Sequence, residues 1–283
     1  MRSLIHIKKI LILILISLYF ISCDTTEPPS IQPIDPIPMD KYPDWSPTGE
    51  WIAYEHHSVV REGDTTGIYI IRPDGTDKHL IISEGYYPSW SPDGKKIAFS
   101  ASTYDKQIWI YYLESGIYRS LTSDGFNVNP AWSNQGSKIA YRSDQKIIIV
   151  DTSGNILIRT NLGGSFPSWS PNDDSICYNS NAVLTILNLA NLTDTTQLFN
   201  VHRPKWHPYL SEIVYSLYDY EKKEGAIWIY NLHNKNKVKL LVGGTLPAWS
   251  PDGNKIVYSF NKGNKAVLFI INRDGTNNIQ LTN

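Results

Sequence analysis

Residues 88–94 read Pro-Ser-Trp-Ser-Pro-Asp-Gly, and variants of this heptapeptide occur six times in the chain. The tryptophans at the centres of the copies are Trp45, Trp90, Trp132, Trp169, Trp206 and Trp249, so successive copies are 37 to 45 residues apart. Self-similarity at such a period is typical of repeat architectures. A repeat of about 40 residues accommodates four short strands and their turns, which make up one blade of a β-propeller.

The residues around each heptapeptide predict the strands of one repeat. In the Ser-Pro-Asp-Gly turn, Pro92 presets φ, Asp93 hydrogen-bonds nearby backbone and Gly94 accepts a positive φ. A short strand leads into the tryptophan, and β-branched and aromatic residues follow the turn at 96–99 and again at 108–111. A weaker strand pattern closes each repeat. We therefore predict an all-β fold, a six-bladed β-propeller of four-stranded antiparallel blades over residues 43–283.

Composition and charge exclude several other classes of protein. The chain has 283 residues, of which 41% are hydrophobic and 19% charged, with a formal net charge of −1. These proportions argue against a disordered chain and against a multi-span membrane protein. The 26 basic residues are balanced by 27 acidic residues and form no basic run in the body of the chain, so we expect no binding to nucleic acid.

The first 22 residues have the features of a signal peptide. Basic residues at positions 2, 8 and 9 precede an apolar run at 10–21, which is shorter than the ~20 residues of a membrane-spanning helix. The segment that ends at Ser22-Cys23 resembles the lipobox of bacterial lipoproteins, and the resemblance implies that Cys23 becomes a lipidated N-terminus. We expect a protein of the bacterial cell envelope, periplasmic or surface-exposed, with no membrane contact except through its N-terminal lipid.

Residues 23–42 are predicted to form a proline-rich tether between the anchor and the folded domain. Its C-terminal end bears on how the propeller ring closes. Either the first and last blades meet by side-chain packing alone, or part of residues 30–42 adds an edge strand to the last blade. The prolines at 33, 36 and 38 argue against the second alternative, because proline cannot donate to a strand ladder.

The second cysteine has a structural role in this interpretation. Cys177 occupies a position that the other repeats fill with alanine or valine, as at Ala98 and Val257. A small apolar residue is expected there, so we predict that Cys177 is buried and inert and that Cys23 has no disulfide partner.

The repeated heptapeptide resembles the PD40 or WD40-like repeat of TolB-type β-propellers, and the resemblance covers essentially all of residues 43–283. It implies the six-bladed fold predicted above. In propellers of this type the repeat tryptophan is usually packed between neighbouring blades, so we expect the same packing here. The resemblance says little about activity, because such propellers serve many functions.

A binding surface is predicted where the inner strands begin, around the mouth of the central funnel. The residues that immediately precede the repeat prolines are Tyr42, Tyr87, Asn129, Phe166, Arg203 and Leu246. Tyrosine and arginine are enriched at interface hot spots, so these six residues are candidates for contact with a partner. The alternative is that they merely plug the channel. Adjacent loop residues add further aromatic side chains, namely Tyr86, Tyr104, Phe126, Tyr218 and Tyr220. The two longest loops of this face, at 56–67 and 216–225, are also candidates for the footprint of a partner.

Motifs of catalysis are weak in this sequence. It has no Gly-x-Ser-x-Gly elbow, no phosphate-binding loop and no His-Glu-x-x-His motif, and no cofactor is predicted. One enzymatic alternative stays open, because oligogalacturonate lyases, which are similar propellers, place histidines around a metal in the funnel. His56, His57 and His202 are the histidines that could share that face, although solvated loop histidines are the simpler interpretation.

These observations together predict a lipid-anchored extracytoplasmic β-propeller that acts as a non-enzymatic module, binding or scaffolding an envelope protein or a glycan. The alternative is a carbohydrate-active, lyase-like enzyme with a metal site in the propeller funnel.

Overall fold

The computed structural model describes residues 37–59, 65–101, 106–219 and 224–283 of the chain. These residues belong to one compact unit, residues 36–283. The predicted signal peptide, Cys23 and residues 24–36 of the predicted tether therefore lie outside the described residues. Within the described residues no helix is long and apolar enough to cross a membrane.

The described residues form 24 strands and no helix, which confirms the prediction of an all-β fold. The first twelve strands are β1 (Ile37–Trp45), β2 (Ile52–Val59), β3 (Gly67–Ile71), β4 (His79–Ser83), β5 (Gly85–Trp90), β6 (Lys96–Ala101), β7 (Ile108–Tyr112), β8 (Ile117–Ser120), β9 (Asn127–Trp132), β10 (Lys138–Ser143), β11 (Lys146–Asp151) and β12 (Ile156–Gly163). The other twelve are β13 (Ser165–Trp169), β14 (Ser175–Ser180), β15 (Val183–Asn188), β16 (Thr193–Phe199), β17 (His202–Trp206), β18 (Glu212–Asp219), β19 (Glu224–Asn231), β20 (Lys237–Val242), β21 (Gly244–Trp249), β22 (Lys255–Lys262), β23 (Lys265–Asn272) and β24 (Ile279–Gln280).

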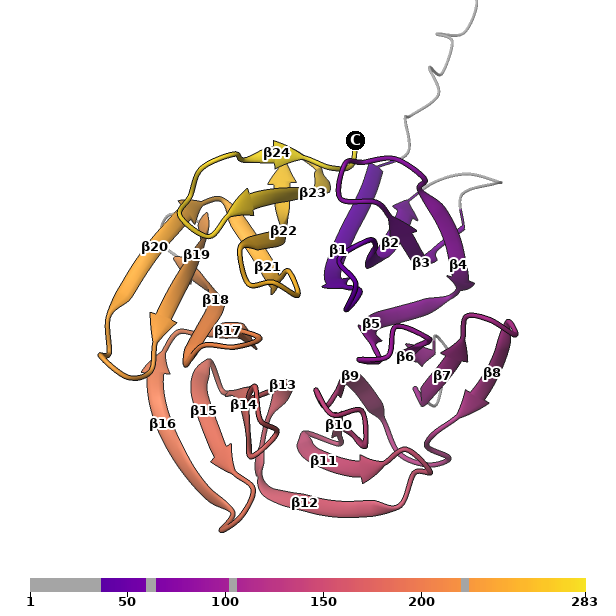
Figure 1. The fold of residues 1–283 in the computed structure, drawn as a ribbon, viewed down its shortest axis with the longest axis vertical. Helices are drawn as coiled ribbons and strands as arrows, with labels where there is room; N and C mark the ends of the chain where they lie inside the picture. The colour runs from indigo at the N-terminus through magenta and orange to yellow at the C-terminus, as the bar shows by residue number, and fades with distance from the viewer. Residues whose placement is uncertain (1–36, 60–64, 102–105, 220–223) are drawn as a thin grey trace, which may run out of the picture. The chain divides into compact units, whose positions relative to one another are not determined.

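Consecutive strands pair antiparallel in groups of four, and each group contains one copy of the repeat. Four of these groups are separate four-stranded sheets, β5–β8, β9–β12, β13–β16 and β17–β20. The remaining strands, β1–β4 and β21–β24, form one eight-stranded sheet. Figure 1 shows the sheets around a common centre, with the strand that carries each repeat tryptophan innermost. This arrangement is that of a β-propeller.

The two halves of the eight-stranded sheet are joined by β1 and β23, which pair in parallel at Met39 and Ala266. The Ser259 hydroxyl also donates a hydrogen bond to the Asp40 carbonyl oxygen at 2.7 Å. Residues 37–42, which the sequence assigned to the tether, therefore belong to a strand, and backbone pairing as well as side-chain packing joins the halves. Pro38 is tolerated because it lies at the beginning of β1, where a missing N–H donor disrupts the ladder least.

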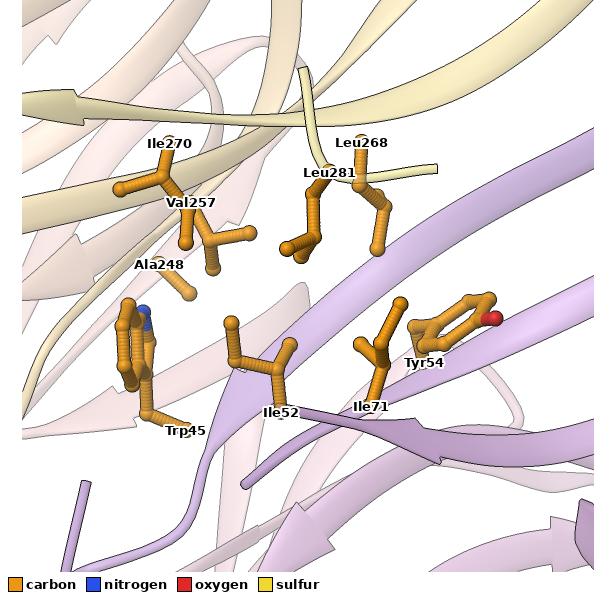
Figure 2. Packing of buried hydrophobic residues seen from close by; sticks show 9 residues of the cluster. All are labelled: Trp45, Ile52, Tyr54, Ile71, Ala248, Val257, Leu268, Ile270 and Leu281. Carbon is orange, nitrogen blue, oxygen red and sulfur yellow. The ribbon is translucent and has the colours of Figure 1, made fainter. Parts of the chain in front are cut away.

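Each repeat tryptophan packs against the sheet that precedes it, which confirms the packing predicted from the sequence. Trp132 of β9 lies in a cluster with Ala98 of β6 and Ile108 and Ile110 of β7. Figure 2 shows the corresponding cluster between the halves of the eight-stranded sheet, where Trp45 lies beside Ala248. The clusters of all the sheets are thus built from the same repeat positions.

Cys177 follows this pattern. It is a free, fully buried cysteine in the cluster that also holds Trp206. Burial raises the pKa of its thiol, so the side chain stays protonated and behaves as a small apolar group. The predicted packing role is confirmed.

The turn after each tryptophan is held by local hydrogen bonds. The Ser91 hydroxyl donates to the Asp93 carboxylate at 2.5 Å and accepts from the Lys96 N–H at 2.9 Å. Gly94 has a φ of +68°, which glycine adopts without strain. Partial burial by itself would raise the pKa of Asp93, but hydrogen bonds from Lys96, Ser91 and the Lys95 N–H lower it to about 2. These turns lie at the end of the sheets opposite to the candidate site.

Candidate functional site

The six residues that precede the repeat prolines share an unusual backbone conformation. Tyr42, Tyr87, Asn129, Phe166, Arg203 and Leu246 all have positive φ, between 52° and 59°. Few residues other than glycine adopt this left-handed region, and bulky side chains do so rarely. In each case the residue lies at an interruption of the register between the innermost strand and the next strand. The repeat therefore builds a β-bulge at the same place in every sheet.

The bulges bring the six side chains together at one mouth of the central channel. With the repeat prolines and Lys205, they line a cavity of about 50 Å³. That volume has room for a water molecule or two but is far below the 300–1,000 Å³ of a typical small-molecule pocket. The grouping predicted from the sequence is therefore present in the structure, and the side chains fill most of the mouth.

Four of these residues, Tyr42, Tyr87, Phe166 and Arg203, form what we call the mouth plug. The rings of Tyr42 and Tyr87 meet edge to face with centroids 4.5 Å apart, and those of Tyr42 and Phe166 are stacked at 6.1 Å. The Arg203 guanidinium carbon lies 4.8 Å from the Tyr42 ring and 5.0 Å from the Phe166 ring. Because the four side chains come from four different sheets, the contacts within the plug also connect those sheets.

Hydrogen bonds fix the plug and its surroundings. Arg203 Nη2 donates to Tyr42 Oη at 2.9 Å, and the Tyr87 N–H donates to the buried Glu55 carboxylate at 3.3 Å. Burial raises the pKa of the Tyr42 and Tyr87 phenols, so both are neutral near neutral pH. The net charge of the plug is consequently that of Arg203.

Beside the plug lies a second group of side chains, His57, Tyr86, Lys106 and Phe126, which we call the rim patch. The Lys106 ammonium is 5.0 Å from the Tyr86 ring and 5.8 Å from the Phe126 ring. The His57 and Tyr86 rings are 5.2 Å apart, and Tyr86 is 6.5 Å from Tyr87 of the plug. Phe126 is 43% exposed. His57, Tyr86 and Lys106 are half-buried, so the patch presents one exposed aromatic ring beside a partly accessible ring and cation.

The sequence identified only part of this patch. It singled out Tyr86 and Phe126 as loop aromatics but not Lys106 or the contact made by His57. Lys106 follows a segment whose structure is outside the described residues, and no motif marks it. Of the other predicted loop aromatics, Tyr104 and Tyr220 lie outside the described residues, and Tyr218 lies on β18.

The three histidines of the metal alternative lie in strands, so their assignment to loops was wrong. His56 is buried on β2, with Nδ1 2.6 Å from Asp40 Oδ1, and His57 Nε2 is 2.5 Å from Glu55 Oε1. His202 begins β17, where burial and the neighbouring Arg203 lower its pKa. The strand β2 is longer than expected because it pairs with the extension of β1. Among the described residues, no group of three or more His, Cys, Asp or Glu side chains is placed to hold a metal ion.

The opposite mouth is a wider hollow of about 290 Å³, which is lined by the repeat tryptophans and the turns that follow them. Inside it, Lys205 Nζ lies 3.3 Å from Asp44 Oδ1, although the two residues belong to different sheets. The sequence contained a signal for this pair that was missed. Both residues occupy the second position of the heptapeptide, where the other copies have serine or alanine.

The fold of this chain is similar to folds of known protein families and solved structures. A model of the TolB beta propeller domain matches residues 39–201. Among solved structures, TolB from Acinetobacter baumannii superposes with a TM-score of 0.69 at 19% identity, covering 88% of this chain and 63% of that chain. This chain therefore spans less than two thirds of the length of that protein. A search of curated proteins found no significant match.

Two further structures show the same fold at lower similarity. The putative TolB from Agrobacterium tumefaciens has a TM-score of 0.61 at 16% identity, covering 72% of this chain and 84% of that one. An oligogalacturonate lyase in complex with manganese has a TM-score of 0.56 at 10% identity, covering 83% of this chain and 90% of the lyase. At such identities the likeness concerns the fold alone.

Proposed function

The chain belongs to the TolB β-propeller domain family, and from this premise we propose that it is a non-enzymatic scaffold that binds a protein partner in the cell envelope. The observation that supports this function is the rim patch. It combines the exposed ring of Phe126 and the half-buried ring of Tyr86 with the ammonium of Lys106, beside a mouth that the plug has almost filled. Aromatic residues on a rigid scaffold can contribute large contact area at little cost in side-chain entropy.

The scaffold itself is proposed to be a ring of six four-stranded blades. Two of the blades, β1–β4 and β21–β24, are the halves of the eight-stranded sheet. In this interpretation the parallel pairing of Met39 with Ala266 connects the first blade to the last.

A protein partner is favoured over a small molecule by the volume at the mouth. A pocket of about 50 Å³ cannot enclose a sugar, whereas a partner surface can contact the rim patch without entering the channel. The left-handed backbone at all six mouth positions supports a functional role for this face, because strained conformations of non-glycine residues cluster at functional sites.

Replacing Tyr86 and Phe126 together by alanine is expected to weaken capture of the partner from the native envelope about tenfold or more, which is the range of hot-spot truncations. The melting temperature should change by only a few degrees, because Phe126 is exposed and Tyr86 is only half-buried. Capture can be measured by affinity purification of the full chain in detergent, followed by quantification of the bound proteins.

A matched control uses two exposed apolar residues at the outer edge of the same sheet as Tyr86. Ile117 and Tyr118 of β8 are 61% and 45% exposed, and their joint replacement by alanine should leave capture unchanged. Capture that survives loss of Tyr86 and Phe126, or that is lost only in the β8 variant, contradicts the proposal. Capture of glycan in place of protein would also contradict it.

The location of the scaffold is also a proposal. We propose that residues 1–22 are a signal peptide, that cleavage leaves Cys23 as a lipidated N-terminus, and that the segment after it tethers the propeller to the membrane. The support is the Ser22-Cys23 junction after the short apolar run, together with the periplasmic setting expected for a TolB-type propeller.

Replacing Cys23 by alanine is expected to move the protein from the detergent-rich phase to the aqueous phase, or to stall processing of the leader. The reason is that the acyl chains supply the only membrane affinity in this interpretation. Phase partitioning of expressed protein measures the change, and Cys177→Ala is the matched control, because this buried thiol should not affect partitioning. Equal partitioning of wild type and Cys23→Ala would reject the anchor.

A further inference from the structure

A second cavity lies beside the mouth plug and was not expected from the sequence. Its volume is about 250 Å³, and it is lined by residues of β13, β14, β17, β18 and β21. Figure 1 shows the inner strands β13, β17 and β21 as neighbours around the centre. Phe166 and Arg203 line both this cavity and the mouth, so the cavity opens where the plug ends. Its volume is below that of a drug-sized site and suits a single side chain or another small group.

The main charge in this cavity is the guanidinium of Arg203. It lies against the rings of Tyr42 and Phe166, and its Nη2 donates to Tyr42 Oη. No carboxylate of the described residues forms an ion pair with it. A guanidinium has five N–H donors in a rigid fork that matches a carboxylate. The cation is therefore fixed in position while most of its donors have no partner among the described residues.

Most of the other polar groups in the cavity are already used within the protein. Asn179 donates from Nδ2 to the Val201 carbonyl and accepts at Oδ1 from the Ala182 N–H. The Ser216 hydroxyl accepts from the Leu246 N–H at 2.9 Å, and the Thr245 hydroxyl donates to the Ser259 carbonyl at 3.4 Å. A neutral sugar needs many hydrogen-bonding partners, and this cavity has few to offer.

The remaining polar side chains are His202 and Tyr218, and His202 is the one next to Arg203 in the sequence. It lines the cavity beside Arg203, and its ring has no hydrogen-bond partner among the described residues. An imidazole held neutral by burial and by a neighbouring cation has one N–H donor and one acceptor. The cavity thus has one fixed cation, one imidazole, the side chain of Tyr218 and the apolar surfaces of Phe166 and Leu217.

We propose that this cavity, the Arg203 pocket, binds the carboxylate of a peptide. The proposal rests on the protein-binding function above and names the chemistry of one contact with the partner. The guanidinium fork receives the two carboxylate oxygens, His202 donates one further hydrogen bond, and the methylene groups that carry the carboxylate lie against Phe166 and Leu217.

The test compares three N-acetylated peptides and one sugar, each titrated into the full chain and followed by ligand-detected nuclear magnetic resonance. The probes are acetyl-Ala-Glu-Ala-amide, its glutamine analogue, acetyl-Ala-Gln-Ala with a free C-terminus, and D-galacturonate. Binding of at least one carboxylate peptide is expected to be about tenfold or more tighter than binding of the neutral glutamine amide, because hydrogen bonds to charged groups are the stronger ones. The first and third probes distinguish a side-chain carboxylate from a chain terminus.

Arg203→Gln should abolish this preference. Arg203→Lys keeps the positive charge but lacks the guanidinium fork, so it should reduce the preference for carboxylate peptides several-fold. This variant replaces Arg203→Gln in the test if Arg203→Gln does not unfold cooperatively. Arg159→Gln is the matched control, because Arg159 is an exposed arginine on β12, and it should have no effect. Equal binding of charged and neutral peptides, a preference that survives in folded Arg203 variants, or tighter binding of galacturonate than of every peptide would overturn the proposal.

The outcome can be separated from that of the proposed function. Partner capture depends on the rim patch and is tested without changing Arg203. If the peptides show no carboxylate preference while capture still requires Tyr86 and Phe126, the pocket proposal fails and the scaffold function stands. If partner capture does not depend on the rim patch, the proposed function is contradicted, irrespective of how the peptides bind.

Discussion

Replacement of Trp132 by alanine is expected to lower the free energy of unfolding by about 3–5 kcal/mol, which is the usual cost of removing a large aromatic side chain from a core. Trp132 is buried against Ala98, Ile108 and Ile110 of the preceding sheet. Its loss leaves a cavity at the contact between two sheets, and the strands on either side cannot close this gap without giving up their own pairing. Urea unfolding followed by far-ultraviolet circular dichroism measures the change.

A second tryptophan provides the control. Trp51 lies outside the strands, is only half-buried and carries the Arg72 guanidinium 4.4 Å above its ring. Trp51→Ala should therefore cost clearly less than Trp132→Ala. The urea concentration at the unfolding midpoint should fall in both variants, and the dependence of the unfolding free energy on urea concentration should not change. Equal, small shifts for the two variants would show that the repeat tryptophan is not a core residue.

Replacement of His56 by leucine is expected to cost about 3–5 kcal/mol, because it leaves the Asp40 carboxylate buried without its partner. Asp40 is 0% exposed, its Oδ1 is 2.6 Å from His56 Nδ1, and its Oδ2 has no hydrogen-bond partner. Both residues lie beside the pairing of β1 with β23. The variant should therefore loosen the joint of the eight-stranded sheet, and its melting temperature should fall accordingly.

The double variant Asp40→Leu/His56→Leu separates the charge from the packing. Exchange of a buried polar pair for apolar residues of similar size is often neutral, so the double variant should recover much of the stability that His56→Leu loses. A double-mutant cycle of unfolding free energies gives the coupling of the two residues. If the double variant is as unstable as the sum of the single variants, the pair is not coupled and the explanation is wrong.

The features of the fold that could be predicted from the sequence belong to the repeat. The Ser-Pro-Asp-Gly turn acts within a few residues, so local chemistry was enough to predict the turn of Ser91 and Gly94. The packing of the repeat tryptophans joins different sheets and was predicted from the family resemblance. The extension of β1 was missed because its reason is remote. Asp40 meets Ser259, which is 219 residues away in the sequence, and no local pattern in a proline-rich segment reports such a contact.

In the candidate site, too, some features could be predicted from the sequence and others could not. The position before each repeat proline could be assigned to one mouth from the order of the strands alone. The conformation at that position could not, because a residue before proline favours extended backbone and Tyr87 instead has a φ of +54°. The contacts of Arg203 with Tyr42 and Phe166 depend on how three sheets converge, and this is settled by packing across the channel.

The single parallel bridge between Met39 and Ala266 has a consequence for the order in which the chain folds. The two residues are 227 positions apart, so during synthesis β1 emerges long before β23 exists. Until then the N-terminal strands can complete their own antiparallel pairs but have no partner for the far edge of β1. Contacts of such large sequence separation slow folding, and unpaired edges expose the intermediate to aggregation. We therefore expect this joint to form late and to need protection of its open edge until the last repeat has been made.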